Sequence, residues 1–284
     1  MTSQFKTVLL LGMLSGIIIV LGGLLGGRAG IIIAFGMALL MNIGSYWFSD
    51  KIVLSMYHAR ELSPEEAPYL YQIVEELSHN ADIPMPRICI VPEQAPNAFA
   101  TGRDPQNAVV AVTEGILALL SPEELRGVIA HEMGHIVNRD ILIQTIAGVM
   151  ASAIVTMANI FQFTAIFGGG NGERNVNPLA ALFLAMLAPL AAGLIQMAIS
   201  RSREYLADET GANLCGQPLA LAGALHKLAQ GSGRIPLQNG NPSTAELFIV
   251  TPVFSSDQAI AKLFSTHPPI EDRIMRLQQM VAHR

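Results

Sequence analysis

The chain has 284 residues, of which 51% are hydrophobic and only 14% are charged, and its mean hydropathy is +0.43. A soluble domain carries about 25% charged residues, so this composition is typical of a membrane protein. The net charge of −5 and the lack of a basic cluster argue against nucleic acid as a partner. Cys89 and Cys215 form no C-x-x-C pair, and we interpret both as structural thiols.

Four long apolar runs predict an integral membrane protein, mainly α-helical, with four transmembrane helices. Each run is near or above the ~20 residues that span the hydrocarbon core as a helix. Only Gly26-Gly27-Arg28 separates the first two runs, which predicts a tight hairpin, and Asn42 within the second is expected to face another helix. The predicted spans are residues 7–27, 29–48, 141–167 and 178–199.

Two stretches of ordinary composition predict a soluble α+β domain assembled from separate parts of the chain. The first contains a helical segment followed by the extended stretches "RICIVPEQ", "NAFATG" and "NAVVAVT", and the second is helical near 203–230 and 267–283. The predicted division is therefore a transmembrane hairpin (1–58), a first soluble half (59–140), a second hairpin (141–200) and a second soluble half (201–284).

The basic residues near the span ends predict which side of the membrane the soluble halves occupy. Arg28 and Arg174 fall on one side, and the larger group falls on the other. The positive-inside rule therefore predicts that both halves face the cytoplasm. The larger group is Lys6, Lys51, Arg60, Arg126, Arg139, Arg201 and Arg203.

The stretch "AHEMGH" predicts half of a metal site on a helix. Ser121, Pro122 and Glu124 supply the cap, the first helical residue and the capping box of that helix. His131 and His135 are four residues apart, so they share one helix face and can reach one metal ion. Glu132 projects about 100° away, where a carboxylate can act on a water beside the metal. The alternative is a pair of polar-core or surface histidines without a metal.

Glu204 is the predicted third ligand. The helix with His131 and His135 is expected to run straight into the third span, so the metal would lie close to the membrane surface. The fourth span returns the chain to the same side at "SRSREYLADE", where Glu204 and Asp208 share one helix face. Asp208 is expected to accept a hydrogen bond from a liganding imidazole. The alternative for Glu204 is a salt bridge with Arg201 or Arg203.

The stretches "AHEMGHIVNRD", "SRSREYLADE" and "STHPPIEDRI", with two spans between the first two, resemble the HtpX family of bacterial heat-shock membrane zinc proteases, kin to the CAAX prenyl endopeptidases. The resemblance covers essentially the whole chain. It implies a gluzincin-like core at the inner membrane, facing the cytoplasm and acting on misfolded membrane proteins in a stress response.

The resemblance also implies roles for residues outside the metal site. Asn97, Ala98, Phe99 and Ala100 match an edge strand whose free backbone groups would pair with a substrate peptide. His267 and Arg273 match an H-P-x-x-x-x-R element that donates to the oxyanion. Their alternative role is structural, at a helix that starts near Pro268 with Thr266 as its cap.

These residues together predict an endopeptidase with one Zn²⁺ per subunit, bound by His131, His135 and Glu204, in which Glu132 moves the proton. The expected partners are membrane-protein substrates and the lipid bilayer, and the sequence specifies no oligomeric state. A rival interpretation is a non-proteolytic membrane chaperone or scaffold in which zinc, with Cys215 as a further ligand, is structural. A CAAX-type prenyl peptidase is the alternative within the enzyme class.

Overall fold

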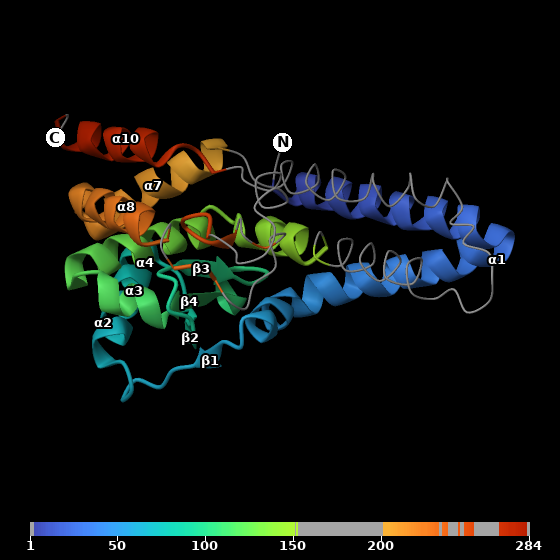
Figure 1. Ribbon diagram of the computed structural model, residues 1–284, viewed down its shortest axis with the longest axis horizontal. Helices are drawn as coiled ribbons and strands as arrows, with labels where there is room; N and C mark the ends of the chain where they lie inside the picture. The colour runs from blue at the N-terminus through green and yellow to red at the C-terminus, as the bar shows by residue number, and fades with distance from the viewer. Residues whose placement is uncertain are drawn as a thin grey trace.

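The computed structural model describes residues 3–150, 152, 201–232, 235–237, 244, 247–252 and 267–282. In Figure 1, helices surround a four-stranded sheet at one end of the molecule, and helix α1 (Ser3–Met56) extends away from that domain. Of the predicted third span only residues 141–150 and 152 are described, and the fourth lies outside the described residues. The number of four spans therefore stays a prediction.

Helix α1 folds back on itself, as the sequence predicts. Gly27 interrupts its helical geometry with φ 56° and ψ −137°, a left-handed φ that favours glycine. The two arms run in opposite directions (Figure 1), and the Asn42 side-chain amide donates to Ser15 Oγ across them at 2.7 Å. Among the described residues one helix, Gly27–Met56, is long and apolar enough to cross a membrane.

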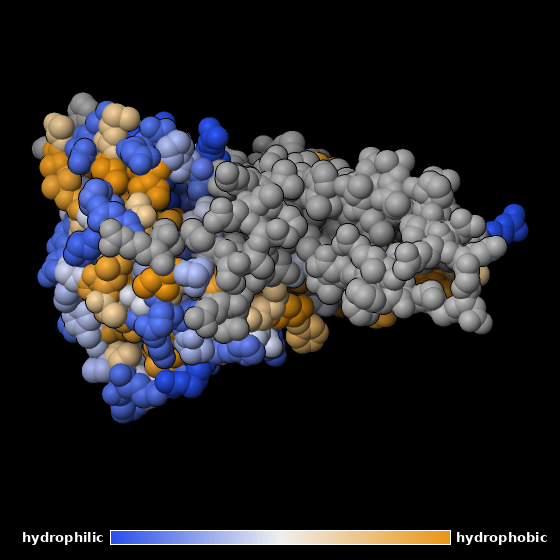
Figure 2. Space-filling model, in the orientation of Figure 1, coloured by the Kyte–Doolittle hydropathy of each residue, from blue (hydrophilic) through white to orange (hydrophobic). Residues whose placement is uncertain are grey.

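Hydrophilic residues are concentrated at the domain end of the molecule. Figure 2 shows them over the helices and strands of the domain, with a second, small hydrophilic spot at the far tip of the α1 hairpin. Large hydrophobic side chains of the second arm of α1, including Ile32, Phe35 and Leu40, are exposed between these ends. This distribution fits a hairpin that enters lipid and a domain that stays in water.

The sheet has the strand order β1-β2-β4-β3. Strands β2 and β4 are parallel, and β1 and β3 pair antiparallel on the outside. The three extended stretches predicted from the sequence each form a strand, whereas the short β1 was not predicted. The bounds are β1 (Arg60–Glu61), β2 (Arg87–Val91), β3 (Ala98–Thr101) and β4 (Val109–Thr113).

Both faces of the sheet are buried. Successive residues of a strand point to opposite faces, so they pack against different neighbours. Ile88 and Val110 join the core with the domain helices. Phe99 and Ala111 join a second cluster that includes Tyr57, next to the C-terminal end of α1. The sheet therefore connects the α1 hairpin to the helical layer.

Helix α4 (Pro122–Val137) carries the HExxH motif and has the predicted capping box. Glu124 N–H donates to Ser121 Oγ at 3.3 Å, and Ser121 N–H donates to the Glu124 carboxylate at 2.8 Å. The other helices of the domain are α2 (Pro68–Ala81), η1 (Pro105–Asn107), α3 (Glu114–Leu119), α7 (Arg201–Cys215), α8 (Pro218–Ser232) and α10 (Ile270–Ala282).

Two predicted helix extents are wrong, whereas the last helix agrees with its prediction to within a few residues. Helix α4 does not run straight into the third span, because it ends at Val137 and Arg139 adopts a left-handed φ of 58° before a new apolar helix, Ile141–Met150. The predicted helix 203–230 is divided at Gly216, which has φ 70°. The last helix starts at Ile270, two residues after Pro268, and Thr266 lies outside the described residues.

Helices α4 and α7 cross in direct backbone contact. A Cβ added at Gly211 would lie 2.7 Å from the backbone nitrogen of His131, and one added at Gly134 would lie 2.8 Å from the carbonyl oxygen of Ala207. Only glycine fits at either position without moving a helix. The crossing brings the first turn of α7 against the HExxH face of α4.

Gly211→Ala should therefore separate the two helices and lower both stability and metal affinity. We expect a loss of about 1–3 kcal/mol in the free energy of unfolding, the usual cost of overpacking. Thermal unfolding and zinc titration of the purified protein in detergent measure the two effects. Gly44→Ala is the control, since no atom lies within 4 Å of the added Cβ; an equally stable Gly211→Ala protein would contradict the crossing.

Candidate active site

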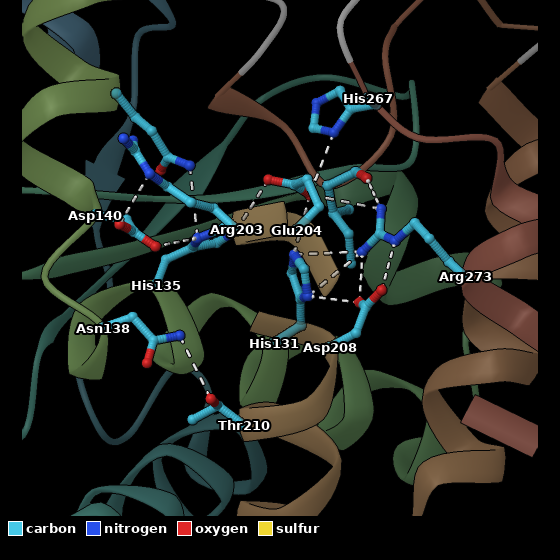
Figure 3. Close-up of polar contacts among 12 residues, drawn as sticks. His131, His135, Asn138, Asp140, Arg203, Glu204, Asp208, Thr210, His267 and Arg273 are labelled. Carbon is cyan, nitrogen blue, oxygen red and sulfur yellow. Dashed lines mark hydrogen bonds and ion pairs between the residues drawn. The ribbon is translucent and has the colours of Figure 1, made fainter. Parts of the chain in front are cut away.

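Three side chains from α4 and α7 converge on one point inside the domain. His131, His135 and Glu204 each present one ligand atom, and these atoms lie within 4.8 Å of one another. The His131 and His135 rings stand nearly perpendicular, with centroids 4.8 Å apart. Figure 3 shows Glu204 facing both imidazoles. We call these three residues the His-His-Glu group.

The His-His-Glu group suits a divalent cation. His131 Nε2 lies 3.8 Å from Glu204 Oε2, and His135 Nε2 lies 3.5 Å from Glu204 Oε1, so the three donors surround a common space. Buried carboxylates outnumber buried guanidinium groups at and around these donors, which favours a cation. The carboxylates are Glu132, Asp140, Glu204 and Asp208, and the guanidinium groups are Arg203 and Arg273.

Asp208 orients His131. Its Oδ1 lies 2.9 Å from His131 Nδ1, so the other ring nitrogen is left to face Glu204. This is the contact that the four-residue spacing of Glu204 and Asp208 predicts. A carboxylate in this position fixes the tautomer and rotation of a liganding imidazole.

Asp140 has a similar position beside His135, which the sequence pattern did not predict. Asp140 Oδ2 lies 3.8 Å from His135 Nδ1, and Gln144 Nε2 lies 3.5 Å from the same nitrogen. Arg203 Nε is 3.5 Å from Asp140 Oδ1. Only the left-handed break at Arg139 turns Asp140 back toward His135. The sequence signal was an acidic residue directly after the motif helix.

Glu132 is buried beside the His-His-Glu group and is 1% exposed. The backbone of Ala100 on β3 lies near its carboxylate and acts to lower its pKa. Its Oε1 atom has no hydrogen-bond partner among the described residues. A buried carboxylate oxygen without a partner is costly, and it is explained by a reacting molecule that binds there.

Burial and neighbouring charges shift the pKa values of the site in different directions. Burial raises the pKa of Glu132 to about 7 and lowers that of His131 to about 4. Burial also opposes protonation of His135, but the carboxylates of Glu204 and Asp140 outweigh it and raise its pKa to about 9. The pKa of Glu204 lies well below its usual range because His267 and His135 outweigh its burial.

Arg273 is not a free donor, because two of its nitrogen atoms already donate to the Asp208 carboxylate. Its Nε and Nη2 atoms donate to both oxygens of Asp208, at 2.8 and 2.7 Å, and Nη1 donates to the Ile249 carbonyl at 2.9 Å. The side chain is 1% exposed. These contacts support the structural alternative for Arg273, which positions Asp208 and through it His131.

His267 approaches the His-His-Glu group from the C-terminal half of the chain. Its Nδ1 atom lies 3.2 Å from Glu204 Oε2. Figure 3 shows the ring above Glu204, on the side away from Asp208. The structure therefore brings His267 to the site, and its action on the oxyanion stays a prediction.

Strand β3 lies at the edge of the sheet, but its outer edge is not free. The Ile249 N–H donates to the Ala98 carbonyl at 3.0 Å, and Phe99 pairs antiparallel with Phe248. The Ala98 carbonyl is therefore not free, because a distant part of the same chain already pairs with it, and the binding of substrate by residues 97–100 stays a prediction.

The alternatives for the metal ligands do not match the contacts. Arg203 pairs with Asp140, while Glu204 turns toward the histidines. Cys215 lies about three turns of α7 beyond Glu204 and contacts the carbonyl of Ala212. It is therefore too far away to close the site as a structural fourth ligand. A buried His-His-Glu group with a glutamate beside it defines the site of a metallopeptidase.

Comparison with known proteins leads to the same class. The model of peptidase family M48 matches residues 64–281. A protease HtpX homologue of Syntrophobacter fumaroxidans is 55% identical over 284 residues, covering 99% of this chain and 100% of its own. One of Pyrococcus furiosus is 56% identical over 276 residues, 97% of this chain and 95% of its own.

The chain therefore belongs to peptidase family M48, and it is a metallopeptidase. The resemblance to the HtpX proteases is confirmed, and the non-enzymatic scaffold is excluded. The crystal structure of S. mikatae Ste24p matches 85% of this chain with 17% identity and a TM-score of 0.45. This chain spans 57% of that structure's length.

Changes to Glu204 and Asp208 should lower metal affinity to different extents. Glu204→Ala removes a ligand and a negative charge, whereas Asp208→Asn keeps all three ligands and weakens only the contacts of residue 208 with His131 and Arg273. For Asp208→Asn we expect zinc affinity to fall about tenfold to a hundredfold, and for Glu204→Ala further. Competition with a chromophoric chelator measures both. Wild-type affinity in Glu204→Ala would require another third ligand.

Arg273→Ala should mainly destabilise the fold, because it leaves the Asp208 carboxylate buried without its cation. The expected loss is about 3–5 kcal/mol, seen as a melting temperature lower by roughly 10 °C. Arg276→Ala is the matched control: Arg276 is on the same helix, is exposed and stacks on Tyr205. If the two variants melted alike, the buried pairing would not contribute to stability.

Proposed function

We propose that this metallopeptidase is a zinc-dependent endopeptidase of a bacterial inner membrane that cleaves misfolded or damaged membrane proteins at segments exposed to the cytoplasm, as part of a stress response. The observation that carries the proposal is the buried His-His-Glu group with Glu132 beside it, in a domain packed against the end of a membrane-length helix. One Zn²⁺ per subunit fits this set of donors.

The side chains of the site have separate tasks. A bound zinc ion would supply Lewis-acid polarisation of the scissile carbonyl and the attacking water. Glu132, with a pKa near 7, accepts a proton from the water and delivers it to the leaving amine. Asp208 and Asp140 hold the two imidazoles in the tautomer that binds metal. His267 would donate to the oxyanion.

The position of the site beside α1 supports a membrane-protein substrate. Tyr57, at the end of that helix, packs on Phe99 of β3 with ring centroids 5.7 Å apart. The edge strand is therefore adjacent to the point where the chain leaves the membrane. A loop or frayed helix of a neighbouring membrane protein reaches this edge without leaving the bilayer. The cytoplasmic orientation rests on the distribution of Lys and Arg.

Glu132→Gln tests the chemistry directly. The amide fills the same space but cannot accept the proton, so we expect cleavage to fall by at least 10² while zinc content and melting temperature hold. Purified protein in detergent is incubated with an unfolded membrane protein and with a prenylated C-terminal peptide, and fragments are identified by mass spectrometry.

The two substrates separate the proposed function from its enzymatic alternative. Cleavage of the membrane protein by wild type, abolished in the variant and by a chelator, supports the proposal. Selective cleavage of the prenylated peptide would favour a CAAX-type peptidase instead. Normal cleavage by Glu132→Gln would exclude Glu132 as the base.

A further inference from the structure

Residues 247–250 lie along the outer edge of β3 and are joined to it by an isolated β-bridge. Phe248 pairs antiparallel with Phe99, and the Ile249 N–H donates to the Ala98 carbonyl at 3.0 Å. This segment and β3 are far apart in the sequence. It therefore occupies the edge at which an added strand finds backbone groups to pair with.

The Asn97 side chain extends this pairing by one residue. Its Nδ2 donates to the Val250 carbonyl at 2.7 Å, and its Oδ1 accepts from the Val250 N–H at 3.4 Å. A side-chain amide offers the same donor and acceptor as a peptide bond, so Asn97 acts here as one more unit of β3. Both contacts are to the backbone of Val250, so they do not depend on the side chains of the segment that pairs there.

Arg273 holds the same segment from the other side. Its Nη1 donates to the Ile249 carbonyl at 2.9 Å, while the rest of the guanidinium binds Asp208. Arg273 Nη1 also lies 3.7 Å from Glu204 Oε2. The carbonyl of Ile249 is therefore within a few ångströms of the His-His-Glu group.

We propose that residues 247–250 are a built-in substitute for substrate: they occupy the strand position that an extended substrate segment takes on β3, and Asn97 and Arg273 hold the backbone of whichever strand is bound. The inference rests on the proposed function, since it assigns the substrate position of that same site. A substrate must displace the segment before it can be cut, so only chains already unfolded enough to form a strand gain access.

The segment is attached to the end of the membrane helix. The hydroxyl groups of Tyr57 and Thr244 are hydrogen-bonded to each other, and the Tyr57 ring packs edge-on against Phe248, with centroids 5.0 Å apart. These contacts hold the segment in place without involving the residues that bind metal. Loosening them should open the edge and leave the chemistry unchanged.

Tyr57→Phe and Thr244→Val each remove this hydrogen bond while keeping the size and shape of the side chain. We expect each to raise kcat/KM for a short unstructured peptide by about fivefold, because each removes this bond. Tyr71→Phe is the matched control: it removes a hydroxyl bonded at 2.6 Å to the Leu62 carbonyl, on α2 and away from the segment. Unchanged rates in both variants would overturn the proposal.

Hydrogen exchange tests the displacement without turnover. The full-length Glu132→Gln protein is mixed with the same peptide at saturation, and amide exchange is followed by mass spectrometry. We expect faster exchange at Ile249 and Val250, with Val110 of β4 unchanged. If the peptide binds while Ile249 stays protected, the substrate position lies elsewhere and this inference fails.

The remaining outcomes separate the two proposals. If wild type cleaves no peptide or protein but the peptide still displaces residues 247–250, the proposed function fails and the edge site stands. If wild type cleaves peptides and Ile249 remains protected, the function stands and the substitute strand is excluded. If the peptide does not bind at all, the edge is not a peptide site and this inference is overturned.

Discussion

The direct backbone contact between α4 and α7 is the constraint on which the site depends. Glycine at 134 and 211 lets the two helices approach until a Cβ at either position would overlap the other backbone. That approach brings Glu204 into reach of both histidines, although the two helices are separated in sequence by the second predicted hairpin. A metal ligand set drawn from two helices requires this precision, because a ligand displaced by an ångström no longer binds.

The second requirement is that the buried carboxylates are paired, and α10 supplies the cationic side chain that pairs with them. Asp208 and Glu204 are 3% and 1% exposed, which is tolerable only if each is paired. Arg273 from α10 bonds to Asp208 and lies near Glu204, so the last helix of the chain completes a site formed mainly by α4 and α7. The metallopeptidase site therefore needs residues from nearly the whole soluble part of the chain.

Much of the site could be predicted from local patterns, and the rest depends on long-range packing. The capping box at Ser121, the shared face of His131 and His135, and the spacing of Glu204 and Asp208 follow from helical periodicity alone. The contact of Asp140 with His135 requires the left-handed Arg139, which no pattern indicates. The pairing of residues 248–250 with β3 joins segments about 150 residues apart, and short apolar stretches carry no information about their partner.

The covered edge of β3 follows from two opposing requirements. A peptidase that binds substrates as added strands needs an open edge, yet an open apolar edge next to a membrane invites unwanted pairing with other chains. The residues on this edge, Ala98 to Ala100, are small or aromatic and carry no charge that would discourage such pairing. A segment of the same chain protects the edge through one backbone bond, one side-chain amide, one guanidinium contact and the packing of its buried side chains, among them Phe248 against Tyr57 and Phe99. A substrate backbone can form the same polar contacts, so displacement exchanges those bonds for equivalent ones. The buried side chains of residues 247–250 favour the covered edge, so the edge opens only to a segment that replaces their packing as well.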